Sequence, residues 1–191
     1  MLSLHHAARL HLSVAGGWFH RAKRLLDEEP EGPEHGFFFW AATMSSIATG
    51  DHAAAVDHAR TAYEIGRRFG VPDLQALGLV FQGYVLVRRG QLAEGQALMD
   101  EGMTWAVGGE LSPLPSALIF CRTIATCYEL GDYRRAREWM DAVADCFERT
   151  GTGWSPGIAR PTGPASWWGA GRGRRESSRP VGPARGSRVW T

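Results

Sequence analysis

Hydrophobic positions recur along most of the chain with the period of an α-helix. Between residues 53 and 69, Ala55, Val56, Ala59 and Ile65 follow the i, i+3, i+4, i+7 spacing of one buried helical face. Comparable segments continue to about residue 150. The pattern predicts an all-α fold with helices at 2–15, 18–29, 36–49, 52–69, 73–89, 92–106, 114–130 and 133–149.

A short glycine-centred signature separates the two helices of each predicted pair. Glycine is followed by a polar or aromatic residue, a bulky residue, two variable positions and a small residue. The copies begin at Gly17, Gly50, Gly90 and Gly131. Glycine readily adopts the left-handed backbone that ends a helix, and Asp51 and Asp132 can cap the helix that follows. The small residues, which let the paired helices approach closely, are Ala22, Ala55, Gly95 and Ala136.

This signature resembles the middle of the tetratricopeptide repeat, a helical hairpin of about 34 residues. The copy at 131–136, Gly-Asp-Tyr-Arg-Arg-Ala, carries the resemblance most clearly, and the segments 70–73 and 108–113 are the expected connectors between hairpins. The resemblance implies a solenoid of about four tetratricopeptide-like helical hairpins. Stacked hairpins bury their faces against neighbours and leave a concave groove for a peptide, a partner domain or another part of the chain.

The composition changes abruptly after Gly157. Residues 159–191 contain seven arginines and one glutamate, a net charge of +6, so the preceding part carries 1 − 6 = −5. The segment is dominated by Gly, Pro, Arg and Ser, a composition that does not form a packed core. We therefore predict a helical-repeat domain at 1–157 and a disordered Arg/Gly/Pro-rich tail at 158–191.

Three interpretations of the tail remain open. It is a plain disordered segment, or a nucleic-acid binder in which Trp167, Trp168 and Trp190 stack on bases while arginines bind phosphate. The third interpretation is an out-of-frame translation product, because GC-rich genes read in another frame yield this composition.

Location and chemistry are constrained by what the sequence lacks. The first residues have no uninterrupted apolar core of a signal peptide, and the longest apolar stretch, 77–87, is shorter than the roughly 20 residues that span a bilayer. Three cysteines without CxxC spacing indicate reduced thiols. We expect a cytoplasmic protein without membrane contact.

No catalytic or metal-binding pattern accompanies the reactive residue types. His5, His6, His11 and His20 stand outside any HExxH motif. Cys121 and Cys127, six positions apart on one predicted helix, point to different faces. The arginine pairs at 67–68 and 134–135 lie among acidic residues and are interpreted as solvated helix faces. The sequence predicts no enzyme, no cofactor and no metal site.

The tetratricopeptide resemblance also suggests which side chains face the groove. Transfer of the groove-facing positions of the first helix of each repeat implies a candidate groove formed by Phe37, Trp40, Met44, Tyr84, Arg88, Cys121 and Tyr128. We expect Trp40 and Tyr84 on the concave side, where aromatic rings and an arginine can grip a peptide or a small ligand. The alternative is that these rings pack between hairpins.

Two segments carry a wider resemblance: Gly-Gly-Glu-Leu-Ser-Pro at 108–113, followed by a cysteine-containing helix, and Asp-Tyr-Arg-Arg-Ala-Arg-Glu-Trp at 132–139. With them, residues 66–150 resemble the helical-repeat region of large actinobacterial LuxR-type transcriptional regulators. The resemblance implies a non-catalytic interaction or effector-sensing module whose partner is a protein, a peptide or another domain of the parent regulator.

The DNA-binding and ATPase parts of such regulators have no counterpart in this sequence. It contains no GxxxxGK[ST] phosphate loop, and no helical region after 157 could supply a recognition helix. We expect a truncated product without direct DNA contact through residues 1–157, prone to self-association through uncapped ends. The alternatives are a stand-alone tetratricopeptide scaffold for protein–protein interaction and a nucleic-acid binder that acts through its basic tail.

Overall fold

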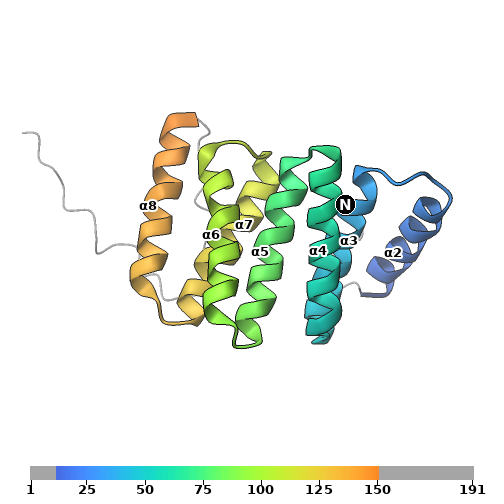
Figure 1. Ribbon diagram of the computed structural model, residues 1–191, viewed down its shortest axis with the longest axis horizontal. Helices are drawn as coiled ribbons and strands as arrows, with labels where there is room; N and C mark the ends of the chain where they lie inside the picture. Colours follow the sequence, from blue (N-terminus) through green and yellow to red (C-terminus); the bar gives the residue numbers. More distant parts are fainter. Residues whose placement is uncertain (1–11, 151–191) are drawn as a thin grey trace, which may run out of the picture. The chain divides into compact units, whose positions relative to one another are not determined.

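The structure is a computed structural model that describes residues 12–150. Within this range the chain forms seven α-helices and no strand, so the described part is all-α as predicted (Figure 1). The helices are α2 (Leu12–Asp27), α3 (Pro33–Thr49), α4 (His52–Phe69), α5 (Pro72–Arg88), α6 (Leu92–Gly108), α7 (Pro113–Glu129) and α8 (Tyr133–Thr150). The tail at 158–191 and most of the helix predicted at 2–15 lie outside the described residues.

Three of the predicted glycine hinges are present, and each joins two antiparallel helices. Gly50, Gly90 and Gly131 all have left-handed φ angles, 78°, 85° and 72°, which glycine adopts without the steric cost of a Cβ atom. The backbone N–H of Ala54 donates to Asp51 Oδ1 at 3.0 Å, and that of Arg135 donates to Asp132 Oδ1 at 3.0 Å. The three predicted hinges are therefore confirmed, as are the predicted caps Asp51 of α4 and Asp132 of α8.

The predicted connectors are also confirmed. Gly70 and Gly109, both with left-handed φ, end α4 and α6, and Pro72 and Pro113 open the next helices, where a missing backbone N–H is harmless. In Figure 1 the three hinges lie at the lower end of the helices and the connectors at the upper end.

Glycine lets the central helices approach closely. A Cβ atom on Gly83 of α5 would lie 2.5 Å from the carbonyl oxygen of Gly95 in α6, and one on Gly95 would lie equally close to the carbonyl oxygen of Gly83. Gly78 of α5 meets the Tyr63 backbone of α4 in the same way. As a result α5 is buried on almost every side, and its apolar residues form the centre of the core together with Met99 and Met103 of α6.

The last hairpin packs differently, because neither α7 nor α8 contains a glycine. Phe120 and Phe147 meet edge to face across the pair, with ring centroids 6.0 Å apart. Asp100 of α6 pairs with Arg135 and accepts a 3.2 Å hydrogen bond from the Trp139 indole. Side chains thus bridge a wider gap here, and Arg135 is half-buried in an ion pair between helices instead of lying on a solvated face as predicted.

The first predicted hinge, at Gly17, is wrong. Helix α2 runs without a break through Gly16 and Gly17, although the sequence pattern predicted one helix ending at 15 and another starting at 18. No capping residue follows Gly17, and Phe19 on the continuous helix stacks on Phe38 of α3 with ring centroids 4.5 Å apart. An aromatic pair contributes about 0.5–1.5 kcal/mol, which is comparable to the cost of about 1 kcal/mol for a glycine within a helix. The described residues accordingly contain three glycine-hinged hairpins.

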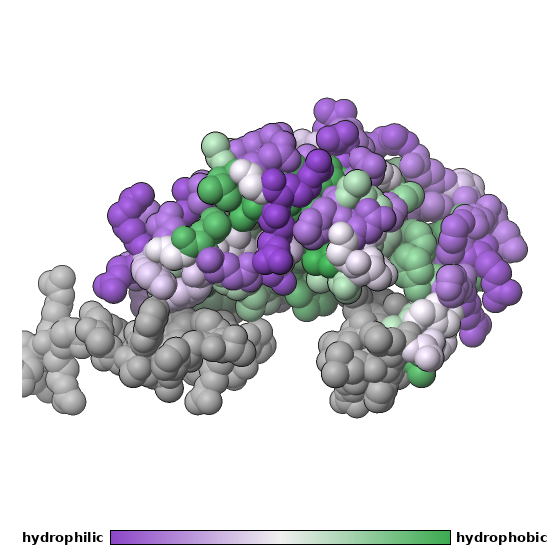
Figure 2. All heavy atoms as spheres, turned by 90° about the horizontal axis from the view of Figure 1, so that it is seen from below, coloured by the Kyte–Doolittle hydropathy of each residue, from purple (hydrophilic) through white to green (hydrophobic). Residues whose placement is uncertain are grey.

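The surface at the hinge end is mainly polar. Figure 2 shows hydrophilic side chains over most of the described surface seen from this end, with smaller hydrophobic patches between them. Exposed apolar side chains next to the hinges include Leu92, Leu130 and Tyr133. None of the described helices is both long enough and apolar enough to cross a membrane.

Candidate functional site

The seven residues of the candidate groove lie on the first helix of each hairpin. Phe37, Trp40 and Met44 belong to α3, Tyr84 and Arg88 to α5, and Cys121 and Tyr128 to α7. These three helices are neighbours in space, since α5 contacts both α3 and α7. The residues predicted from the sequence therefore lie on three adjoining helices, although their side chains have different surroundings.

On α3 the large rings are divided between the core and the surface. Trp40 is only 5% exposed and meets Phe81 of α5 edge to face, with ring centroids 6.0 Å apart. Met44 is half-buried against the same core, whereas Phe37 is exposed. Trp40 thus contributes to packing between α3 and α5, and Phe37 is the ring of this helix that a partner can reach.

Tyr84 and Arg88 lie beside two charged residues of α7. The guanidinium carbon of Arg122 is 4.3 Å from the centroid of the Tyr84 ring, a cation–π contact between α5 and α7. Glu129 lies between the two arginines, with its Oε2 3.9 Å from Arg88 Nη1 and its Oε1 4.0 Å from Arg122 Nη1. We refer to Tyr84, Arg88, Arg122 and Glu129 as the arginine cluster.

The arginine cluster carries a net positive charge that its own carboxylate does not cancel. Two guanidinium groups face one carboxylate, and both ion-pair distances exceed the 2.7–3.2 Å of an N–H···O hydrogen bond. Such loose, partly exposed pairs contribute little to stability, about 0–1 kcal/mol. Tyr84 is 8% exposed, and the Arg122 side chain that lies over its ring is 28% exposed.

The two remaining candidates, Cys121 and Tyr128, also lie on α7. The Tyr128 hydroxyl donates to Met140 Sδ at 3.8 Å and its ring lies 5.9 Å from that of Tyr133, so Tyr128 faces α8. Cys121 is exposed next to Arg122. Partial burial raises the pKa of the Cys121 thiol in spite of the nearby Arg122, which keeps this group in its weakly nucleophilic protonated form at neutral pH.

The buried cysteine of α7 is even further from a reactive thiolate. Burial raises the pKa of Cys127 to about 11, against the opposing effect of Arg135. Within residues 12–150 no three His, Cys, Asp or Glu side chains come together as a metal-binding group. The arginine cluster, by contrast, brings two guanidinium groups to one carboxylate.

Sequence reasoning found half of this cluster and missed Arg122 and Glu129. A signal for Glu129 was present in the repeats. Arg88 and Glu129 both stand two positions before a hinge glycine, Gly90 and Gly131, and therefore occupy equivalent places in successive hairpins. Since α5 and α7 are in contact, opposite charges at these equivalent places predict a pair between them.

No protein-family model, curated protein or solved structure matches this chain.

Proposed function

We propose that this protein is a non-catalytic interaction module, in which the hairpins α3–α4, α5–α6 and α7–α8 are tetratricopeptide-like repeats of one solenoid. Two observations support the repeat arrangement. The same hinge recurs in each hairpin, with fully buried small residues at Ala55, Gly95 and Ala136, and alternate helices touch, as α3 does α5 and α5 does α7.

The proposed binding site is the arginine cluster, and the proposed partner is a protein segment that presents a carboxylate. The observation that carries this proposal is the Arg122 guanidinium held over Tyr84 while its ion pair with Glu129 stays at 4.0 Å. An incoming carboxylate can approach Arg122 and Arg88 closely enough to accept hydrogen bonds, whereas Glu129 stays 3.9–4.0 Å away from them. A charge-assisted hydrogen bond of this kind is worth about 1.5–3 kcal/mol.

Such a module fits the helical region of a LuxR-type transcriptional regulator, which residues 66–150 resemble in sequence. In that setting the acidic segment belongs to another domain of the regulator or to a separate protein. The proposal requires no reactive side chain, in keeping with the raised thiol pKa values of Cys121 and Cys127.

A titration with short peptides tests the proposal. A tetraglutamate peptide should shift the NMR signals of Tyr84 and the Arg122 side chain, whereas tetraglutamine should leave them unchanged. Arg122→Gln should weaken tetraglutamate binding by about tenfold, the equivalent of one lost charge-assisted hydrogen bond, and binding should fall with added salt.

The matched control is Arg134→Gln. Arg134 is an exposed arginine of α8 that pairs with Glu138 on its own helix, and its removal lowers the net charge by the same amount. Equal weakening by both variants, or shifts at Tyr84 that Arg122→Gln leaves unchanged, would contradict the proposed site.

A further inference from the structure

Thr123 on α7 differs from every other threonine that the structure describes. The others donate their hydroxyl hydrogen to a backbone carbonyl three or four residues earlier, as Thr43 does to Phe39 and Thr126 does to Arg122, both at 2.9 Å. This is the common way for a helical threonine to satisfy its hydroxyl. The remaining examples are Thr49, Thr61, Thr104 and Thr150.

The Thr123 hydroxyl is turned away from that carbonyl and into the protein. The residue is 2% exposed, and its Oγ1 has no hydrogen-bond partner among the described residues. A buried hydroxyl without a partner costs about 1–3 kcal/mol. Thr123 could satisfy its hydroxyl by donating to the backbone carbonyl of Ile119, as the other threonines do with theirs, so its orientation calls for another partner.

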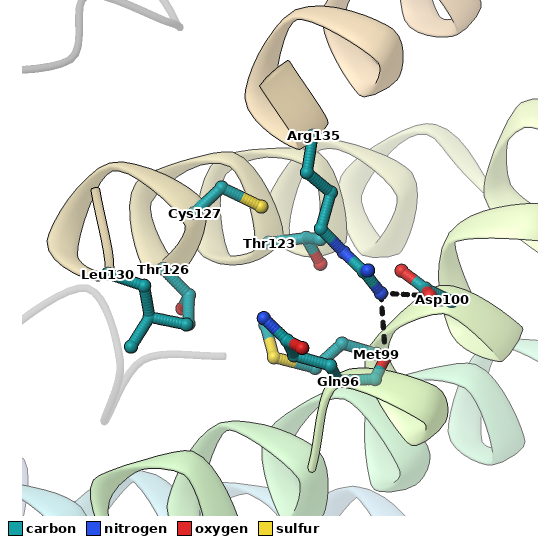
Figure 3. Close-up of a pocket in the computed structure, with 8 residues that line it drawn as sticks. All are labelled: Gln96, Met99, Asp100, Thr123, Thr126, Cys127, Leu130 and Arg135. Atoms are coloured by element: carbon teal, nitrogen blue, oxygen red, sulfur yellow. Dashed lines mark hydrogen bonds and ion pairs between the residues drawn. The ribbon is translucent and has the colours of Figure 1, made fainter. Parts of the chain in front are cut away.

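The hydroxyl faces a small cavity between α6, α7 and α8 (Figure 3). The centre of a water molecule can occupy about 10 Å³ of this cavity, which is close to the minimum for a single water. Its walls are Gln96, Met99 and Asp100 of α6, Thr123, Thr126 and Cys127 of α7, Leu130, and Arg135 of α8.

The walls also supply the polar partners that an internal water needs, usually two to four. Figure 3 shows the Thr123 hydroxyl, the Gln96 amide and the Arg135 guanidinium turned toward the same space. Arg135 pairs with Asp100 and donates to the backbone carbonyl oxygen of Gln96 at 3.5 Å. A guanidinium carries five N–H groups, so Arg135 has further donors for a water.

We propose that one water molecule binds in this cavity and hydrogen-bonds the Thr123 hydroxyl, bridging α7 to the polar groups of α6 and α8. The cavity is too small for a larger ligand. The bridge accounts for the orientation of Thr123, because a hydrogen bond to the bound water replaces the hydrogen bond that the hydroxyl would otherwise donate to a backbone carbonyl. It also adds a solvent-mediated link to the junction where Arg135 and Trp139 fasten α8 to Asp100.

High-resolution crystal structures of the wild type, Thr123→Val and Thr126→Val test this assignment. Valine keeps the shape of threonine and removes the hydroxyl. Thr126 lines the same cavity, but its hydroxyl already donates a hydrogen bond to the backbone carbonyl oxygen of Arg122. The wild type and Thr126→Val should show a water peak at hydrogen-bonding distance from Thr123 Oγ1, and Thr123→Val should lose it.

An empty cavity in the wild type, with the Thr123 hydroxyl rotated onto the carbonyl of Ile119, would overturn the assignment. So would a water that remains at full occupancy in Thr123→Val. If the valine variant does not crystallise, oxygen-17 magnetic relaxation dispersion in solution counts long-lived internal waters. The signal should drop by one water on going from the wild type to Thr123→Val, and an unchanged signal would equally refute the bridge.

Discussion

The hairpins α5–α6 and α7–α8 turn at the same kind of glycine hinge but are held together by different forces. In α5–α6, Gly83 and Gly95 allow backbone to touch backbone, and the two helices run close together over much of their length. In α7–α8 no glycine is present, the helices approach less closely, and α8 is tied to α6 through Asp100. The hinge determines that a hairpin forms, and the residues at the helix crossing determine how tightly it packs.

This difference has consequences for stability within the molecule. Close apolar packing contains no charges for salt to screen. Polar contacts at a half-buried junction are screened by salt and exchange with water more readily. We expect α7–α8 to open at a lower free energy than α4–α6, as regions with fewer buried apolar contacts do.

The largest effect is expected for Gly83→Ala. The new methyl group would lie 2.5 Å from the Gly95 backbone carbonyl oxygen, which no side-chain rotation can move away, and 2.8 Å from Met99 Cγ. We predict a loss of about 3 kcal/mol or more in the free energy of unfolding, at the upper end of overpacking penalties. Chemical denaturation followed by circular dichroism measures it, and a change below about 1 kcal/mol would mean that the α5–α6 crossing is not as tight as described.

A moderate effect is expected for Asp100→Ala. The change removes the partner of Arg135 and of the Trp139 indole at the α6–α8 junction, and should cost about 1–2 kcal/mol. Hydrogen exchange should accelerate in α8 and remain unchanged in α5. Arg134→Ala, which breaks the exposed pair with Glu138, serves as the control and should cost less than about 0.5 kcal/mol. Equal acceleration of hydrogen exchange in α5 and α8 would show that α8 does not open independently of α5.

The smallest effect, of opposite sign, is expected for Gly17→Ala. A Cβ atom at Gly17 meets nothing within 4 Å, and the residue lies inside the continuous helix α2. Alanine should therefore stabilise the protein by about 0.5–1 kcal/mol. A loss of stability would indicate a left-handed glycine at this position and would restore the hinge that the sequence pattern suggested.

The elements that could be predicted from the sequence are those with local causes. A glycine followed by a capping residue marks Gly50 and Gly131 as hinges, and both signals act within a few residues. Gly17 lacks such a cap, but so does the hinge at Gly90, and what distinguishes Gly17 is that Phe19 of the continuous helix stacks on a distant residue, Phe38. The error at Gly17 is therefore a case of tertiary packing overriding a local preference.

The candidate site shows the same limit. Tyr84 and Arg88 could be named because repeat positions indicate which helical face they occupy. Arg122 could not, since its contact with Tyr84 depends on the lateral offset between α5 and α7, which no single helix encodes. Burial of Trp40 against Phe81 likewise depends on how α3 and α5 cross.

Native-state hydrogen exchange across a series of low denaturant concentrations can show whether α7–α8 is joined by weaker, polar contacts to the glycine-packed helices α4–α6. Amides of α7 and α8 should exchange through an opening of lower free energy than those at the centre of α5, around Val85, which should exchange only on global unfolding. A single opening free energy shared by α5, α6, α7 and α8 would contradict this prediction.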